Sequence, residues 1–139
     1  MIYLAEHEGE ELSMVSAVAE QYNIPRQFLA KLVQTLSRNH LIKSYRGRKG
    51  GIELARPADQ IRLLEIVHAI DGPPPVHEMC IIGLDVCDDN ATCPLHFEWT
   101  HIKNLIRDTL EHQTLADLAE GMRTKRRELA ESLKEEDET

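Results

Sequence analysis

The segment from residue 25 to residue 54 restricts the fold of this chain most strongly, because a helical pattern there runs directly into a glycine-rich hairpin. In PRQFLAKLVQTLSRNH the apolar residues recur at helical spacing. LIKSY, RGRKGG and IELA then read as a strand, a turn and a returning strand. Upstream, Ser13 is suited to cap a helix over MVSAVAEQY, and NIP breaks that helix before Pro25 opens the next one. Two helices joined by a short turn and followed by a hairpin predict a winged helix-turn-helix.

The predicted second helix and hairpin also carry most of the basic charge of an acidic chain. The formal net charge is -8, yet residues 25–62 hold nine Lys and Arg against two acidic residues. Such a region suggests that a polyanion docks there, although charge alone is equally compatible with a solvated surface. Its place in a winged helix-turn-helix favours duplex DNA. The predicted DNA contacts are Arg26, Gln27, Lys31 and Gln34 on the outer helix face, and Arg46, Arg48 and Lys49 at the hairpin tip. The inner face is predicted to bury Phe28, Leu29, Leu32, Val33 and Leu36.

The rest of the chain predicts further helices around a linker. QIRLLEIVHAIDG has the pattern of an amphipathic helix, PPP at 73–75 reads as a stiff linker, and a long helix with a broad apolar stripe starts at Pro94. That stripe predicts a dimerisation helix, with packing onto its own domain as the alternative. We therefore expect a mainly α fold with a small β-hairpin. Its parts are a winged helix-turn-helix domain (1–72), a linker with a cysteine-containing loop (73–93), and a dimerisation helix followed by a short helix and a charged, fraying tail (94–139).

All three cysteines lie in one stretch, CIIGLDVCDDNATCPLH, which also supplies a histidine. Structural zinc sites bring their ligands in close pairs, and no two of these cysteines are that close. An iron–sulfur cluster is larger than one ion, so widely spaced thiolates on a loop can surround it. Cys80, Cys87, Cys93 and His96 would supply four ligands. Zinc and redox-active thiols stay open as alternatives at this point.

The sequence predicts a cytoplasmic protein without a membrane span. No apolar run approaches the ~18 residues that a span needs, and the first ten residues are acidic and lack a signal-peptide pattern. A reducing compartment and an odd number of cysteines both disfavour a disulfide. Nothing in the sequence marks an oxyanion hole or a catalytic triad, so no enzymatic activity is expected.

Taken together, these motifs resemble the IscR/NsrR family of winged-helix transcription regulators, the Rrf-two family. The likeness is carried by RGRKGGIELARPADQIRLLEIVHAIDG, IPRQFLAKLVQTLSRNHLIKS, the three-cysteine loop, CPLH with Trp99, and TLADL, and it covers nearly the whole chain. Two positions depart from the pattern. His40 stands where the family usually carries Gly at the end of the recognition helix. Met1 corresponds to the middle of the family's first helix, which leaves two alternatives: the true start lies upstream of this Met1, or the N-terminal helix is truncated.

The resemblance implies a homodimer that binds palindromic promoter sites, with the state of an iron–sulfur cluster altering DNA affinity. Cys80, Cys87 and Cys93 correspond to the family's cluster cysteines, and His96 to the histidine that completes a 2Fe–2S site in some members; a 4Fe–4S cluster is the alternative. We expect a repressor of this kind. A zinc- or thiol-redox-dependent DNA-binding regulator and a small iron–sulfur carrier protein are the competing hypotheses.

Overall fold

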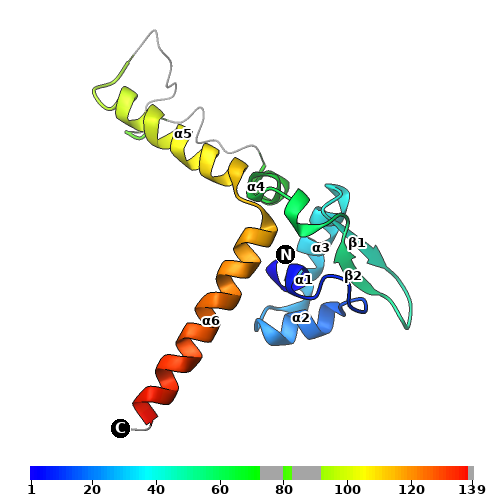
Figure 1. The fold of residues 1–139 in the computed structure, drawn as a ribbon. Coiled ribbons are helices and arrows are strands. Elements are labelled where there is room, and N and C mark those ends of the chain that lie inside the picture. The colour runs from blue at the N-terminus through cyan, green and yellow to red at the C-terminus, as the bar shows by residue number, and fades with distance from the viewer. Residues whose placement is uncertain (73–79, 83–91, 138–139) are drawn as a thin grey trace.

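The computed structural model describes residues 1–72, 80–82 and 92–137. Along these residues the elements are α1 (Ile2–Glu6), α2 (Val15–Gln21), α3 (Arg26–Arg38), β1 (Ile42–Tyr45), β2 (Gly51–Leu54), the short 3-10 helix η1 (Ala58–Gln60), α4 (Leu63–Asp71), α5 (His96–His112) and α6 (Leu115–Asp137). Figure 1 shows α2, α3 and the β1–β2 hairpin on one side of the molecule, while α5 and α6 extend away from it. The predicted mainly helical fold with one small hairpin and a winged helix-turn-helix is confirmed.

The turn between α2 and α3 is set by a left-handed residue. Asn23 has a φ of 50°, and the amide of Ile24 donates to the carbonyl of Ala19 at 2.9 Å, which closes the end of α2. Asparagine adopts this backbone conformation more readily than most residues do. The turn is therefore short, and α3 starts directly after Pro25.

The two strands pair in an antiparallel hairpin, with Ile42 opposite Leu54 and Tyr45 opposite Gly51. Ser13 extends this pairing, because its amide donates to the carbonyl of Ile52 at 3.1 Å and its carbonyl accepts from the Ile52 amide at 2.8 Å. The prediction that Ser13 caps α2 is wrong, since Met14 takes the cap position without a side-chain bond. The backbone of Ser13 is used by the wing instead.

The hydrophobic core lies between α1, α2, α3, the hairpin and the first turns of α6. Its most deeply buried side chains are Leu41, Ile61 and Leu115, which come from three separate parts of the sequence. The start of α6 is tied to this core by backbone bonds: the amide of Leu115 donates to the carbonyl of Ile61 at 2.8 Å, and the amide of Leu63 donates to the carbonyl of Gln113 at 3.0 Å. Residues far along the chain thus complete the winged domain.

Residues 115–137 form one continuous helix, which corrects the prediction of a short helix followed by a fraying tail. The helix is capped at its start, where the amide of Thr114 donates to the carboxylate of Asp117 at 2.9 Å and the Asp117 amide donates to the Thr114 hydroxyl at 3.1 Å. The Thr114 hydroxyl also donates to this carboxylate at 2.6 Å, and the hydrogen bonds from the hydroxyl and the amide of Thr114 hold the pKa of Asp117 below its usual value. Beyond the cap, the sequence is rich in Leu, Ala, Glu, Lys and Arg, which all favour helix.

Replacing His40 by glycine is expected to stabilise the fold by about 0.5–1 kcal/mol. His40 has a φ of 56° at the end of α3, and a side chain costs free energy in that conformation, whereas glycine does not. The neighbouring Asn39 has a φ of -90°, so Asn39→Gly is the matched control and should destabilise. Urea unfolding of the three proteins measures both effects, and a His40→Gly variant no more stable than the parent would contradict the strain argument.

Candidate DNA-binding surface and cysteine site

The recognition helix α3 presents one polar face to solvent and buries the other. All four predicted DNA contacts on this helix, Arg26, Gln27, Lys31 and Gln34, are exposed. The opposite face packs Leu29, Val33 and Leu36 into the core. Cationic and amide groups that share an exposed helix face can reach base edges and phosphates in a major groove.

Phe28 does not belong to the buried face of α3, although its helical spacing predicted that it would be buried. Its side chain is 55% exposed, next to Gln27 on the outer surface of α3. Exposing a large apolar ring is unfavourable in water unless a partner covers it. In a major groove the methyl group of thymine is such a partner. Phe28 is therefore a candidate contact that the helical pattern alone misassigned, because it lies at the edge of the apolar stripe.

The tip of the wing is a tight turn that only glycine permits at two places. Gly47 has a φ of 104°, and the amide of Gly50 donates to its carbonyl at 3.0 Å. A Cβ atom at Gly50 would overlap the carbonyl oxygen of Tyr45. The predicted contacts at the tip, Arg46, Arg48 and Lys49, are all exposed. Figure 1 shows this hairpin and α3 on the same side of the molecule.

Arg56 holds the base of the wing against the end of the recognition helix. Its guanidinium donates to the carbonyls of His40 at 3.3 Å and Gln60 at 3.1 Å, and it pairs with the Glu65 carboxylate. Partial burial raises the pKa of Glu65, but hydrogen bonds from the Arg62 amide and from Arg56, with the charges of both arginines, outweigh this and lower it. Because His40 ends α3 and Arg56 follows β2, these bonds limit how the wing moves relative to α3.

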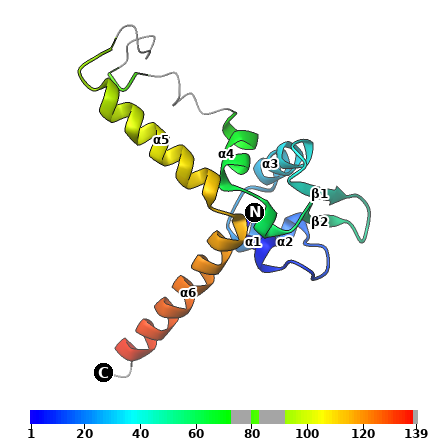
Figure 2. The same cartoon turned by 45° about the horizontal axis from the view of Figure 1, so that its top comes forward.

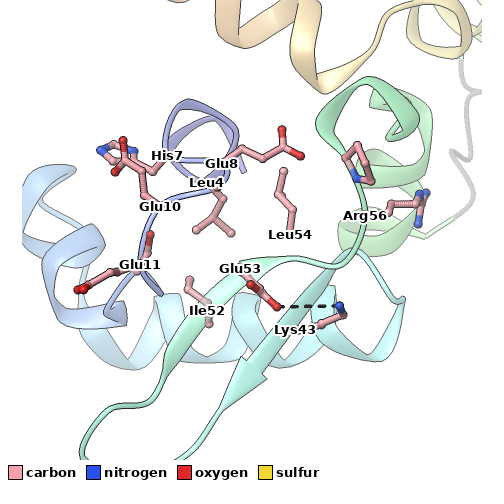
Figure 3. A pocket seen from close by; sticks show the side chains of 13 residues that line it. Leu4, His7, Glu8, Glu10, Glu11, Lys43, Ile52, Glu53, Leu54 and Arg56 are labelled. Atoms are coloured by element: carbon pink, nitrogen blue, oxygen red, sulfur yellow. Dashed lines mark ion pairs between the residues drawn. The ribbon is translucent and has the colours of Figure 1, made fainter.

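A cavity of about 380 Å³ lies behind the wing, between the loop after α1 and strand β2. Figure 3 shows Glu8, Glu10 and Glu11 on the loop side, with Lys43 and Glu53 from the hairpin opposite. The Lys43 ammonium lies 3.9 Å from the Glu53 carboxylate, and the Glu8 carboxylate accepts from the Ala58 amide at 3.3 Å. Acidic residues predominate in the lining of this cavity.

Gly50→Ala is expected to weaken DNA binding about tenfold, because the added methyl group forces the wing turn to rearrange and moves the basic tip. The added atom would also come within 2.8 Å of the Arg46 carbonyl carbon. Gly121→Ala is the control, since nothing lies within 4 Å of its added atom and alanine favours helix. Titration of a labelled duplex by fluorescence anisotropy measures both variants. Equal affinities for Gly50→Ala and the parent would mean that the wing does not touch DNA.

Two of the three cysteines lie together although thirteen positions separate them in the sequence. The Sγ atoms of Cys80 and Cys93 are 3.8 Å apart, and Cys80 is only 5% exposed. Two thiolates on one tetrahedral metal, each at ~2.3 Å, lie about 3.8 Å from each other. The separation is far longer than the ~2.05 Å of a disulfide bond.

His96 is the first residue of α5, and its amide donates to the carbonyl of Cys93 at 3.0 Å. Its side chain is 4% exposed, and its ring packs edge-on against Phe97 at 5.3 Å. Cys87, the fourth predicted ligand, lies outside the described residues. Within the described ranges no group of three His, Cys, Asp or Glu side chains is arranged to hold a metal ion, so the complete ligand set stays a prediction.

The comparisons with known proteins agree with this fold. The model of the family Rrf2, described as "Iron-dependent Transcriptional regulator", matches residues 1–121. The chain belongs to the Rrf2 family. A protein of Mycobacterium tuberculosis described as an HTH-type transcriptional regulator is 35% identical over 122 residues, which are 87% of this chain and 74% of that protein. The resemblance inferred from the sequence is thereby confirmed.

Solved Rrf2-like structures superpose on most of the chain. CymR of B. subtilis, described as the global cysteine regulator, has a TM-score of 0.73 and 27% identity over 86% of each chain. IscR of T. potens has a TM-score of 0.68 and 26% identity over 87% of this chain and 78% of its own. The protein is thus an Rrf2-family transcription regulator with a DNA-binding helix-turn-helix, not an enzyme. None of its described helices is long and apolar enough to span a membrane.

Proposed function

We propose that this Rrf2 protein is a cytoplasmic homodimeric repressor that binds palindromic promoter sites, with DNA affinity set by an iron–sulfur cluster. The single observation that carries the proposal is the 3.8 Å separation of the Cys80 and Cys93 sulfur atoms, in a chain whose family is described as iron-dependent. Neither thiol is in a disulfide.

The donor set suits a cluster. Soft thiolates favour iron–sulfur centres, and imidazole replaces thiolate in some 2Fe–2S sites. Cys80, Cys87, Cys93 and His96 would hold the cluster, with 2Fe–2S favoured by the histidine and 4Fe–4S as the alternative. The near-complete burial of Cys80 and His96 supports this assignment, because a dry shell stabilises a centre against solvent. When bound, the cluster supplies a centre that can gain or lose an electron and that iron supply or oxidants can remove.

Dimerisation is assigned to α5. Several large apolar side chains on this helix are exposed in the single chain, namely Phe97, Ile102, Leu105 and Ile106. A surface of this kind is unfavourable in water and is typical of an interface. A two-fold dimer places two α3 helices on successive turns of a palindromic site. Gln27 and Arg26 would then read base edges, and Phe28 would meet a thymine methyl.

The cysteines link the proposed cluster site to the spacing of the two recognition helices. Cys80 follows α4 and Cys93 precedes α5, so thiolates held in one site fix the start of α5 to the segment after α4. The helix α4 packs against both α3 and α5. A change at the thiolates therefore alters how α5 sits on the winged domain, and with it the spacing of the two recognition helices. DNA affinity depends on that spacing.

The same sulfur separation also suits two other regulators. One tetrahedral zinc ion would hold two thiolates at this distance, and two thiols this close could oxidise to a disulfide with modest movement. A small iron–sulfur carrier is the competing function from another class. The exposed basic wing disfavours it, because a carrier has no need of one.

The deciding experiment is purification without oxygen, followed by a visible absorption spectrum and assays of iron, acid-labile sulfide and zinc. Iron and sulfide in equal amounts with thiolate-to-iron absorption bands are expected. A colourless protein with one zinc per chain would support the zinc regulator. A colourless, metal-free protein after anaerobic reconstitution would leave only the thiol switch or a cluster-free DNA binder.

A further inference from the structure

The second half of α6, residues 122–137, begins where the similarity to the Rrf2 family model ends at residue 121. Sixteen residues of helix measure about 24 Å. Figures 1 and 2 both show this half leaving the winged domain, with the C-terminal end far from α1 to α4. Short isolated helices are only marginally stable in water. A partner for this segment would explain why its sequence favours helix so far from the winged domain.

One side of α6 carries apolar residues from Leu115 to Leu133, with Arg126 between Met122 and Leu129. Leu118, Met122, Leu129 and Leu133 recur at helical spacing and continue the line of Leu115, which is completely buried in the core. Leu129 is 54% exposed and Leu133 is 63% exposed. The stripe therefore starts inside the domain and runs out into solvent.

The charges of the same half are divided into two blocks. Residues 123–127 contain four basic residues and no acidic one, whereas 128–137 contain five acidic residues and one lysine. If two copies of this helix lay parallel, like charges would face each other. If they lay antiparallel, the basic block of each copy would face the acidic block of the other.

One residue in the second half of α6 is attached to the winged domain. The Arg126 guanidinium lies 2.8 Å from the carboxylate of Glu6 on α1, and Glu6 is itself almost completely buried. This pair ties the basic block to the winged domain of its own chain. The side chains of Leu129 and Leu133 lie beyond that attachment, so they are available to a partner.

We propose that the distal half of α6 pairs antiparallel with the distal half of α6 in a second copy of this chain. Leu129 and Leu133 form the apolar centre of the contact, and the two charge blocks set its direction. A two-fold axis across the helices makes both halves of the contact equivalent. This interface is separate from the one assigned to α5, and it depends neither on the cluster nor on DNA binding.

Two full-length charge variants test the pairing. The acidic variant carries Arg123→Glu, Lys125→Glu and Arg127→Glu; the basic variant carries Glu128→Lys, Glu131→Lys and Glu135→Lys. Each variant alone places like charges across the contact, whereas a mixture places opposite charges across it. Native mass spectrometry of an equal mixture counts the complexes. Random pairing gives equal numbers of mixed and same-variant dimers, and we expect mixed dimers to outnumber same-variant dimers roughly tenfold at low salt.

The control separates this contact from general attraction between oppositely charged proteins. A protein with Glu10→Lys, Glu11→Lys and Glu20→Lys gains the same charge on exposed positions of the winged domain. Mixed with the acidic variant, it should form complexes in random proportions. Random proportions for the α6 pair as well would overturn the proposal while leaving an α5 dimer intact. Monomers in every sample would overturn both the α6 contact and the α5 dimer.

Discussion

Replacing Arg46 and Lys49 by alanine is expected to weaken duplex binding by about 100-fold or more at 0.1 M salt. Both side chains are exposed at the tip of a wing whose turn is fixed by Gly47 and Gly50. A dimer with this pair of changes loses four cationic contacts. Each contact releases counterions from DNA, so the slope of log affinity against log salt should become shallower by about 3.6. Anisotropy titrations between 50 and 200 mM salt, on a site selected from random duplexes, measure both quantities.

A matched control shows whether position or total charge matters. Arg107 is an exposed arginine on α5, a helix that extends away from the wing in both views, and its guanidinium pairs with the adjacent Asp108. Arg107→Ala should leave the affinity and the salt slope close to those of the parent. If the wing variant and this control behaved alike, the wing would not be a DNA contact. A loss of affinity with an unchanged slope would indicate a folding defect instead.

The winged domain could be predicted from the sequence because its signals are local. The helical spacing of α3, the glycines of the turn and the basic residues at its tip each act over a few positions, and the structure places all seven predicted DNA contacts on exposed surface. The left-handed residue at position 40 was also visible as a departure from glycine. Local rules of turn and helix geometry are sufficient for such features.

The errors arose where distant parts of the chain decide the outcome. Ser13 has the residue type of a helix cap, but its backbone pairs with Ile52, nearly forty positions away. Phe28 fits the apolar spacing of α3, yet its side chain is 55% exposed, whereas Leu29, Val33 and Leu36 form the buried face of this helix. The C-terminal segment looked like a fraying tail because it is highly charged, whereas its helix is anchored by Leu115 in the core and by the Arg126–Glu6 ion pair.

The cysteine site lies between these two cases. The sequence gives the ligand types but no distances, and only the folded chain brings Cys80 within 3.8 Å of Cys93. These two residues flank a loop, and closing a loop of that length has an entropic cost that a bound group or packing must offset. Cys87 lies outside the described residues, so its participation is a prediction from the sequence.

Cys80→Ala and Cys93→Ala should each remove most of the bound iron and sulfide, together with the visible absorption bands. Both sulfur atoms are placed to share one centre, and an alanine in either position leaves one metal coordination site without a protein ligand. If the site regulates DNA binding, each variant should bind a promoter with the affinity of the cluster-free parent. The cluster-containing parent should differ from both by about 5- to 150-fold, the usual range for coupling between two sites.

The control for the two cysteine variants is a substitution at Thr100, one helical turn beyond His96. The buried hydroxyl of Thr100 has no hydrogen-bond partner among the described residues, so Thr100→Val replaces it with a methyl group of similar size at little cost. That variant should retain iron, sulfide and the full difference in DNA affinity between cluster-containing and cluster-free protein. If the cysteine variants lost their iron but kept the promoter affinity of the cluster-containing parent, the cluster would be structural rather than regulatory. If they kept their iron, Cys80 and Cys93 would not be its ligands, and the 3.8 Å pair would have to be explained as packing alone.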